Sequence, residues 1–380
     1  MAATTATSNE PTPPGLLHPR ERLLMGPGPS TVSPRVLAAL AAPTLGHLDP
    51  QFIEVMDETC QLLRDVFRTN NRLTFPVSGT GMAGMETIAA NLIEPGDEVI
   101  VCINGVFGAR MQDVMQRCGA TVHPVKVDWG QTFSEELIAG AINYHNQAKL
   151  LAMVHAETST GAHQPLEAIS KRVHEAGMLF VVDAVTSLGG QELAVDDWAI
   201  DAVYSGTQKC LACPPGLSPV SFSDAAVSVM EGRRQPCQSW YLDVSMLKDY
   251  YFGEGGRAYH HTPPINMIYA LREALTMVVE EGLTARVQRH RDLHEQLRAG
   301  LEELGLSYIP ENSLCTLNCV RVPEGVDEAA IRKRLLEEFD IEIGSGLGEF
   351  AGHAWRIGLM GYTASHRNVT TLLAALRECL

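Results

Sequence analysis

Short apolar runs alternate with stretches of helical periodicity from about residue 73 onward. The strand-like runs include Glu98–Ile103, Thr121–Val127, Lys149–His155 and Met178–Asp183, and the first three are followed by the helix-like stretches Phe107–Cys118, Ser134–Tyr144 and Leu166–Ala176. Strands separated by helices of this length are typical of βαβ units. The pattern therefore predicts an α/β fold built on one large, open, mainly parallel sheet.

The same domain gains further elements on both sides of this region. Strand-like runs occur at Leu73–Val77, Ala202–Ser205 and Pro219–Phe222, and a helix-like stretch spans Met85–Leu92. We therefore expect the large α/β domain, with an N-terminal arm, to occupy residues 23–264. Residues 1–22 are expected to be a flexible tail, because the first 14 are rich in Ala, Thr and Pro.

The pattern changes after residue 264, where long helices are predicted at Ile265–Glu281 and Thr284–Leu304, with Gly282 as a helix stop between them. The elements expected after them are a strand at Leu314–Val322, a helix at Asp327–Glu338, short strands at Ile341–Ile343 and Ala354–Ile357, and a closing helix at Ser365–Leu380. Residues 265–380 are thus predicted to form linking helices and a small C-terminal α+β domain.

Composition and charge narrow the classes of partner. The 380 residues are 45% hydrophobic and 19% charged, and the formal net charge is −16, which argues against nucleic acid or an anionic membrane as the main partner. No apolar run reaches the length of about 18 residues that suggests a membrane-spanning helix. The odd number of nine cysteines fits reduced thiols, so we expect a cytoplasmic location. Cys210 and Cys213 have no second pair at zinc-ribbon spacing, and we expect no metal site.

The segment Asp201-Ala-Val-Tyr-Ser-Gly-Thr-Gln-Lys209-Cys-Leu-Ala-Cys-Pro-Pro-Gly216 is the most informative in the chain. It places Lys209 after a predicted strand, on a loop of small residues, where open α/β sheets bind ligands. A lysine that forms a Schiff base needs this setting, because burial keeps its amine neutral and a flat ring must approach closely. The alternative is an ordinary surface lysine.

A second candidate residue is Asp183, which ends the apolar run Leu179-Phe-Val-Val-Asp183. A carboxylate at the end of a buried strand requires a cationic or hydrogen-bonding partner. A protonated pyridine nitrogen would be such a partner, and pairing with it would keep the ring an electron sink. The alternative role for Asp183 is a helix N-cap.

A third candidate is Ser78-Gly-Thr-Gly-Met-Ala-Gly84, between a predicted strand and a predicted helix. Glycines, hydroxyls and a helix N-terminus together make an anion site. The glycines Gly79, Gly81 and Gly84 also match the dinucleotide fingerprint, so a nicotinamide-dependent oxidoreductase is an alternative outside the pyridoxal-phosphate (PLP) enzymes. Ser78 and Thr80 favour a monophosphate, and the acidic residues some 20 positions on lie in a predicted turn.

Together these segments resemble the class V aminotransferases, a family of fold-type I PLP enzymes, and most of all their alanine–glyoxylate and serine–pyruvate branch. The likeness runs from Met25-Gly-Pro-Gly-Pro-Ser30 to Arg356-Ile-Gly-Leu-Met-Gly361, and it includes His155-Ala-Glu-Thr-Ser-Thr-Gly161, Val182-Asp-Ala-Val-Thr-Ser-Leu-Gly-Gly190, Tyr259-His-His-Thr262 and Ile341-Glu-Ile-Gly-Ser-Gly-Leu-Gly348. The resemblance implies a large PLP-binding domain and a ping-pong transfer of an amino group from alanine or serine to glyoxylate or pyruvate.

The resemblance also implies a role for each matching residue. Lys209 would carry PLP and act in proton transfer, and Asp183 would bind the pyridine nitrogen. The cofactor-binding residues would be Ser78, Gly79, Thr80 and Gln208 at the phosphate, Val185 and Phe107 on the ring, Thr158 near the ring hydroxyl and the substrate, and Tyr259 and Thr262 at the phosphate of a neighbouring subunit. The substrate would meet Arg356, which grips its carboxylate, and the Gly26–Gly28 loop, which forms a wall of a small pocket. The implied assembly is a homodimer with shared active sites.

Two departures leave the substrate open. Phe107 stands where the branch often has a tryptophan, and Met82 where it often has a histidine. A ureidoglycine–glyoxylate or aminoethylphosphonate–pyruvate transaminase, or a lyase, is an alternative within the PLP class. A desulfurase fits poorly, because Cys315 and Cys319 fall in a predicted strand rather than in a mobile loop. A non-catalytic PLP-binding regulator lacks support, since no helix-turn-helix segment is appended.

Overall fold

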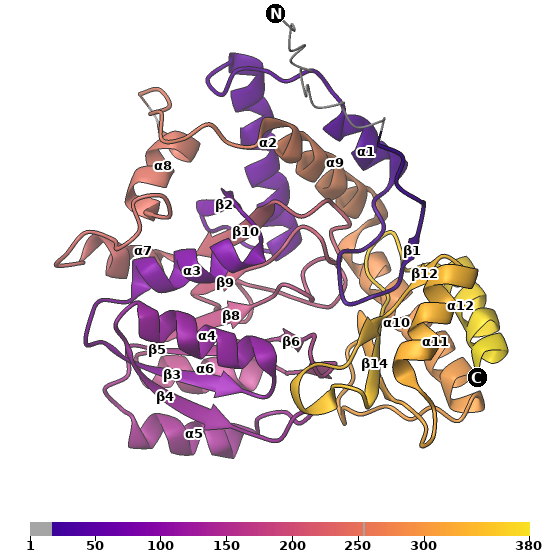
Figure 1. The fold of residues 1–380 in the computed structure, drawn as a ribbon. Coiled ribbons are helices and arrows are strands. Elements are labelled where there is room, and N and C mark those ends of the chain that lie inside the picture. Colours follow the sequence, from indigo (N-terminus) through magenta and orange to yellow (C-terminus); the bar gives the residue numbers. More distant parts are fainter. Residues whose placement is uncertain (1–16, 254) are drawn as a thin grey trace, which may run out of the picture.

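The computed structural model of the protein describes residues 17–253 and 255–380. Residues 1–16, which make up most of the predicted tail, lie outside the described part. Figure 1 shows a large α/β unit, coloured from indigo to salmon, beside a smaller unit in orange and yellow that carries the C-terminus.

A seven-stranded sheet forms the centre of the large unit, with the order β2-β10-β9-β8-β5-β3-β4. Its strands are β2 (Leu73–Ser78), β3 (Glu98–Ile103), β4 (Thr121–Lys126), β5 (Leu150–Val154), β8 (Leu179–Asp183), β9 (Ala202–Tyr204) and β10 (Leu217–Phe222). Only β10 runs antiparallel to its neighbours in this sheet. The sheet is thus mainly parallel, as the apolar pattern predicted.

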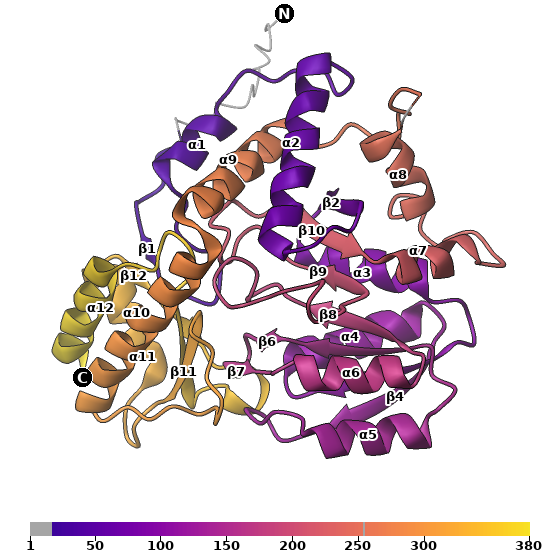
Figure 2. The same cartoon turned by 180° about the vertical axis from the view of Figure 1, so that it is seen from behind.

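Helices cover both faces of this sheet. The helices α3 and α4 lie in front of it in Figure 1, and α6 lies in front of it in the opposite view of Figure 2. The helices of the large unit are α1 (Pro34–Leu40), α2 (Pro50–Phe67), α3 (Gly81–Leu92), α4 (Val106–Arg117), α5 (Glu135–Tyr144), α6 (Glu167–Glu175), α7 (Asp224–Glu231), α8 (Val244–Phe252) and α9 (Ile265–Glu281). Because both faces are covered, strands such as β5 and β8 are buried at every position.

The smaller unit combines a three-stranded antiparallel sheet, of order β11-β14-β13, with three helices. Its elements are α10 (Leu283–Glu303), β11 (Leu317–Arg321), α11 (Glu328–Glu338), β12 (Ile341–Glu342), β13 (Gly344–Ser345), the 3-10 turn η1 (Gly348–Phe350), β14 (Ala354–Gly358) and α12 (His366–Cys379). The arm strand β1 (Leu23–Leu24) pairs with β12, and β6 (Ala156–Glu157) pairs with β7 (Ala162–His163). The N-terminal arm therefore reaches the smaller unit.

Each unit has a hydrophobic core, and the described residues include a third, small cluster that contains Cys210 and Met360. The larger core surrounds the seven-stranded sheet and includes side chains of α9, and the smaller core surrounds β11 and β14 and includes Met25 of the arm. The division of the chain at residues 22 and 264 stays a prediction. Within the described residues, no helix combines the length and the apolar character needed to span a bilayer.

Local sequence signals account for most helix starts. Among the described helices, seven begin after a Ser or Asp whose side chain accepts a backbone N–H hydrogen bond: Ser33, Asp49, Ser134, Ser223, Asp243, Asp327 and Ser365. The helix expected at Met85 instead begins at Gly81, so the glycine loop after β2 is shorter than predicted. Its N-cap, Thr80, makes no side-chain capping hydrogen bond, which leaves its hydroxyl free of that role.

Candidate active site

A buried carboxylate and a buried phenol meet at the carboxyl ends of β8 and β9. Asp183 is the last residue of β8 and is 2% exposed. Its Oδ1 accepts a hydrogen bond from Val185 N at 2.8 Å, and its Oδ2 accepts one from the Tyr204 hydroxyl at 2.5 Å. Burial raises the pKa of Asp183 to about 6, against the effect of both hydrogen bonds. A cationic partner here would stabilise the charged carboxylate.

Lys209 lies in the loop after β9 and is buried against the N-terminal arm. Its Nζ donates a hydrogen bond to Pro27 O, and its backbone carbonyl accepts one from Ser30 Oγ at 2.7 Å. Burial, followed by the positive charge of Arg356, lowers the pKa of Lys209 to about 8. A neutral, nucleophilic amine is therefore much more accessible here than at a surface lysine.

Gly28 is the arm residue that allows this approach. Its φ is +107°, and a Cβ added to it would lie 2.7 Å from Lys209 Cδ. Neither the backbone conformation nor the space suits a larger residue. The structure thus brings Gly28, a predicted pocket wall, directly against Lys209.

The start of α3 lies beside the same loops. A Cβ on Gly81 would lie 3.5 Å from Val185 Cγ2 and 3.7 Å from Gly206 Cα, so the helix start, the segment after β8 and the lysine loop meet here. Gln208 Oε1 is buried without a hydrogen-bond partner among the described residues. Helix N–H groups and small residues make this corner suited to an anion.

Ser78 differs from its neighbours, because its hydroxyl is already engaged. Ser78 is buried at the end of β2, and its Oγ lies 2.7 Å from His261 Nε2. Burial lowers the pKa of His261 to about 4, so that imidazole is neutral at physiological pH. Gly79 and Thr80 follow Ser78, and Gly79 has a φ of +145°.

A buried glutamate organises the side of the site that holds Phe107 and Thr158. Glu157 Oε2 accepts hydrogen bonds from Phe107 N and Gly108 N at 3.1 and 3.3 Å. Its Oε1 accepts from Ser159 N at 3.1 Å and from Ser159 Oγ at 2.5 Å. Glu157 thereby caps the first turn of α4 and ties it to the segment that contains Thr158.

Arg356 enters from β14 of the smaller unit and is buried, as its place in an apolar strand predicted. Its Nη1 donates to Thr158 O at 3.1 Å, and its Nε donates to Ser345 O at 2.7 Å. Its positive charge also lowers the pKa of Lys209, so the smaller unit adds a second cation to the electrostatics of this site. Two neighbouring cations favour an anionic group between or beside them.

Tyr259 and Thr262 make no described contact with the other predicted site residues, although His261 between them contacts Ser78. Both are exposed, and the Tyr259 ring is 62% exposed and packs on His47 with the ring centroids 4.9 Å apart. The single chain gives neither side chain a contact with Lys209 in the described contacts. Their predicted place in a neighbouring subunit stays a prediction.

Three residues of this region were missed by reasoning from the sequence: Tyr204, Glu157 and His261. Each lies within a motif that was noted, but none was given a role. A buried phenol beside a buried carboxylate requires the end-to-end register of β8 and β9, in which Asp183 pairs with Tyr204. The glutamate in the His155–Gly161 motif was the one usable signal.

Two other sequence signals can be compared with the structure: the Cys210/Cys213 pair and the dinucleotide fingerprint. Cys210 and Cys213 are free and buried, burial raises the pKa of Cys210 to about 12, and no metal-binding cluster occurs among the described residues. The strands on either side of α3, β2 and β3, lie far apart in the sheet, and the neighbour of β2 is the antiparallel β10. A dinucleotide fingerprint requires adjacent parallel strands, so Gly79, Gly81 and Gly84 do not form one.

The fold and the arrangement of lysine, carboxylate and helix start define a fold-type I PLP enzyme. The family model for aminotransferase class V matches residues 32–364. The chain is 42% identical to alanine–glyoxylate aminotransferase of Oryctolagus cuniculus, over 94% of this chain and 92% of that one. It is 40% identical to (S)-ureidoglycine–glyoxylate transaminase of Bacillus subtilis (strain 168), over 94% and 90%. The crystal structure of alanine–glyoxylate aminotransferase from Nostoc sp. superposes with a TM-score of 0.95 at 46% identity and covers 99% of both chains.

The chain belongs to the class V aminotransferase family. It is a transaminase, and its cofactor is PLP. The residues present fit that group. A lysine with a lowered pKa suits the aldehyde, a buried carboxylate suits the pyridine nitrogen, and a helix start without a side-chain cap suits the phosphate.

Proposed function

We propose that this protein transfers the amino group of a small amino acid, alanine or serine, to glyoxylate or pyruvate. The observation that carries the proposal is that Lys209, Asp183 and Arg356 are all buried and that the charges of the other two act on the Lys209 amine. The three residues come from the lysine loop, β8 and β14. The similarity to alanine–glyoxylate aminotransferases over nearly the whole chain supports the same substrates.

We assign Lys209 and Asp183 as the catalytic pair that holds PLP. When bound, PLP supplies an electron sink that lets the α-carbon of an amino acid lose its proton. Lys209 Nζ, with its pKa lowered to about 8, then takes up that proton and returns it. Asp183 holds a positive charge at the pyridine nitrogen, and Tyr204 keeps the carboxylate oriented through Oδ2.

The remaining cofactor contacts follow the loops around this pair. Gly79 and Thr80, with the N–H groups that begin α3, would hold the phosphate together with Gln208. Ser78 would act there through its hydroxyl, which first has to leave His261 or share it. Val185 and Phe107 would cover the two faces of the ring, and Thr158 would lie near the ring hydroxyl and the substrate.

The substrate is held by its carboxylate in this proposal. The guanidinium of Arg356 is oriented by Ser345 O and Thr158 O, and its planar fork suits a bidentate contact. Gly28 closes the pocket from the arm side and favours a small substrate. Phe107 and Met82 differ from the residues that the alanine–glyoxylate branch often has at these positions. Ureidoglycine is therefore a second donor to test, because the chain is also similar to a ureidoglycine–glyoxylate transaminase.

We also propose that the active molecule is a homodimer in the cytoplasm. The exposed Tyr259 and Thr262 would then reach the phosphate bound in the partner subunit. All nine cysteines are free, which supports a reducing compartment.

The decisive experiment compares the wild-type protein with Lys209→Ala. We expect the wild type to show the absorbance of lysine-bound PLP and to lose it on mixing with alanine or serine. The variant should lack that band, and its turnover should fall by more than about 10³-fold. A screen of single amino acids, ureidoglycine included, followed by single oxo acids, identifies donor and acceptor. Turnover that survives in Lys209→Ala would refute the assignment.

A further inference from the structure

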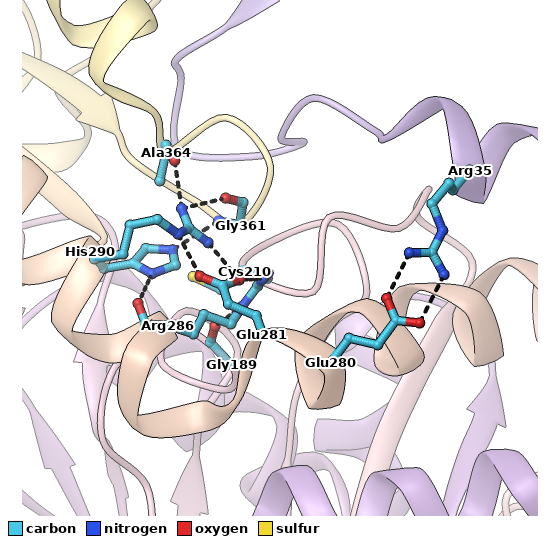
Figure 3. Close-up of polar contacts among 10 residues, drawn as sticks. Arg35, Gly189, Cys210, Glu280, Glu281, Arg286, His290, Gly361 and Ala364 are labelled. Atoms are coloured by element: carbon cyan, nitrogen blue, oxygen red, sulfur yellow. Dashed lines mark hydrogen bonds and ion pairs between the residues drawn. The ribbon is translucent and has the colours of Figure 1, made fainter.

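A partly buried polar cluster joins the two units at the junction of α9 and α10. It consists of Glu281, the last residue of α9, and Arg286, Arg289 and His290 in the first turns of α10 (Figure 3). We refer to these four residues as the junction cluster. A cavity of about 790 Å³ lies beside it, lined in part by Glu281 and Arg289.

Arg286 contacts the segment that follows β8 and the loop that carries Lys209. Its side chain is almost fully buried. Its Nε donates to Gly189 O at 2.7 Å, in the segment after β8, and its Nη2 donates to Cys210 O at 2.8 Å, next to Lys209. The third contact, from Nη1 to Glu281 Oε2, measures 2.6 Å. All three nitrogens of the guanidinium therefore donate to acceptors in the large unit, one of which belongs to α9.

Arg289 holds the loop that follows Arg356. Its Nη1 donates to Gly361 O at 3.2 Å and also to Ala364 O. Its Nε and Nη2 donate to the two carboxylate oxygens of Glu281 at 2.6 and 3.0 Å. The Glu281 carboxylate therefore connects Arg286, which contacts the Lys209 loop, with Arg289, which contacts the loop after Arg356.

The His290 ring forms a second link between Arg286 and the loop that contains Gly361. Its Nδ1 donates to Arg286 O at 2.7 Å, and its Nε2 accepts from Gly361 N at 3.0 Å. Only the neutral ring satisfies both partners, because a carbonyl accepts and an N–H donates. Burial, followed by the charge of Arg286, lowers the pKa of His290 to about 3, so the neutral ring is stable.

The two loops that these residues hold also touch each other. A Cβ on Gly361 would lie 2.4 Å from Cys210 O, so the loops meet without room for a side chain. Gly361 is five residues after Arg356, and Cys210 follows Lys209 directly. The relative position of these two loops therefore governs the separation of the Lys209 amine and the Arg356 guanidinium.

We propose that Glu281, Arg286 and Arg289 are positioning residues that set the separation of Lys209 and Arg356, and so select α-amino acids over longer ω-amino acids. This inference rests on the proposed function, in which Lys209 acts at the reacting carbon and Arg356 holds the carboxylate. In an α-amino acid the carbon that carries the amino group is bonded directly to the carboxylate. In β-alanine one more carbon lies between that carbon and the carboxylate. A fixed separation rejects the longer substrate, and a relaxed one admits it.

Adjacent residues on α9 provide a matched pair of variants. Glu280 also forms a double contact with an arginine, Arg35, but that pair lies at the surface, with the two side chains 54% and 48% exposed (Figure 3). Surface ion pairs contribute little, so Glu280→Gln serves as the control. Glu281→Gln removes the shared charge, while Arg289→Lys keeps a charge and loses the fork. Both sites are partly exposed, which lets the variants fold.

The test uses PLP-loaded enzyme with alanine and glyoxylate, and then with β-alanine in place of alanine. For Glu281→Gln and for Arg289→Lys we expect kcat/KM with alanine to fall on the order of 10- to 100-fold, mainly through KM. The preference for alanine over β-alanine should fall with it. Affinity for PLP and the absorbance of the lysine-bound cofactor should stay as in the wild type. Glu281→Asp, which restores the charge, should recover part of the loss.

Two outcomes separate the proposals. If the wild type binds PLP and turns over but Glu281→Gln and Arg289→Lys match Glu280→Gln in KM and in preference, the junction cluster does not position the site. If the wild type itself shows neither the cofactor absorbance nor turnover, the proposed function fails first. Loss of PLP binding in step with KM would mark a merely structural role and would also overturn the inference.

Discussion

At the scale of single residues, burial sets the chemistry of this site. Lys209 and Asp183 carry opposite charges, yet burial shifts both toward their neutral forms, with pKa values of about 8 and about 6. In our proposal, the aldehyde and the pyridine nitrogen of PLP are the partners of these two groups. The sequence predicted both residues from their place at strand ends, but it did not reveal Tyr204 as the donor that holds Asp183.

The lowered pKa of Lys209 predicts how apoenzyme combines with PLP at different pH values. Only the neutral amine attacks an aldehyde, so the rate should rise about tenfold per pH unit up to about pH 8 and then level off. Stopped-flow absorbance of PLP added to cofactor-free protein measures this rate. Free lysine acetylated on its α-amine, which leaves the ε-amine free, is the control. Its rate should keep rising toward the ordinary ε-amine pKa near 10.5. A protein profile that follows the free lysine would contradict the burial argument.

At the scale of elements, the periodicity of apolar residues was sufficient for most of the fold. The strand Glu98–Ile103 and the helix Ile265–Glu281 have the predicted bounds. The predicted start of α3 was wrong by four residues, because Gly81 and Gly84 are poor helix formers. Only the packing of the helix explains why a glycine occupies position 84. A Cβ on Gly84 would lie 2.1 Å from Ser218 Oγ of β10.

The N-terminal arm provides a prediction at this scale. Gly28→Ala adds a methyl group against Lys209, whereas Gly96→Ala meets nothing within 4 Å although its φ of +94° is similarly left-handed. We expect both variants to lose about 1–2 kcal/mol of unfolding free energy. Only Gly28→Ala should also lower kcat/KM, on the order of 100-fold. Chemical denaturation and steady-state kinetics measure the two effects, and equal kinetics in the two variants would argue against contact between the arm and Lys209.

At the scale of the whole molecule, the site draws on both units and, in our proposal, on a second subunit. Arg356 belongs to β14 of the smaller unit, and it contacts Thr158 O of the large unit only because the two units dock. Tyr259 and Thr262 are exposed in the single chain, and the proposed dimer would use these two exposed side chains at the partner's site.

Mixed dimers test this sharing. Lys209→Ala and the double variant Tyr259→Ala/Thr262→Ala should each be nearly inactive or weak in PLP binding alone. Unfolded together and refolded, they should form heterodimers in which one of the two sites has all its residues, with about half the turnover of a wild-type dimer per heterodimer. Activity measured after separation of tagged heterodimers decides the matter. No recovery in isolated heterodimers would mean that both residues serve their own chain.

The sequence by itself determined the α/β class, the strand-end positions of Lys209 and Asp183, and the burial of Arg356, because each depends on local apolar patterns that neighbouring residues set. It did not determine the contacts of Glu157 with Phe107, of Tyr204 with Asp183, or of the junction cluster with the loops after Lys209 and Arg356. Those contacts join residues that lie 21 to 76 positions apart in the sequence, from Tyr204 with Asp183 to Arg286 with Cys210. Only the packing of the two units decides which buried polar groups meet, since a buried donor accepts whichever partner the fold brings to it.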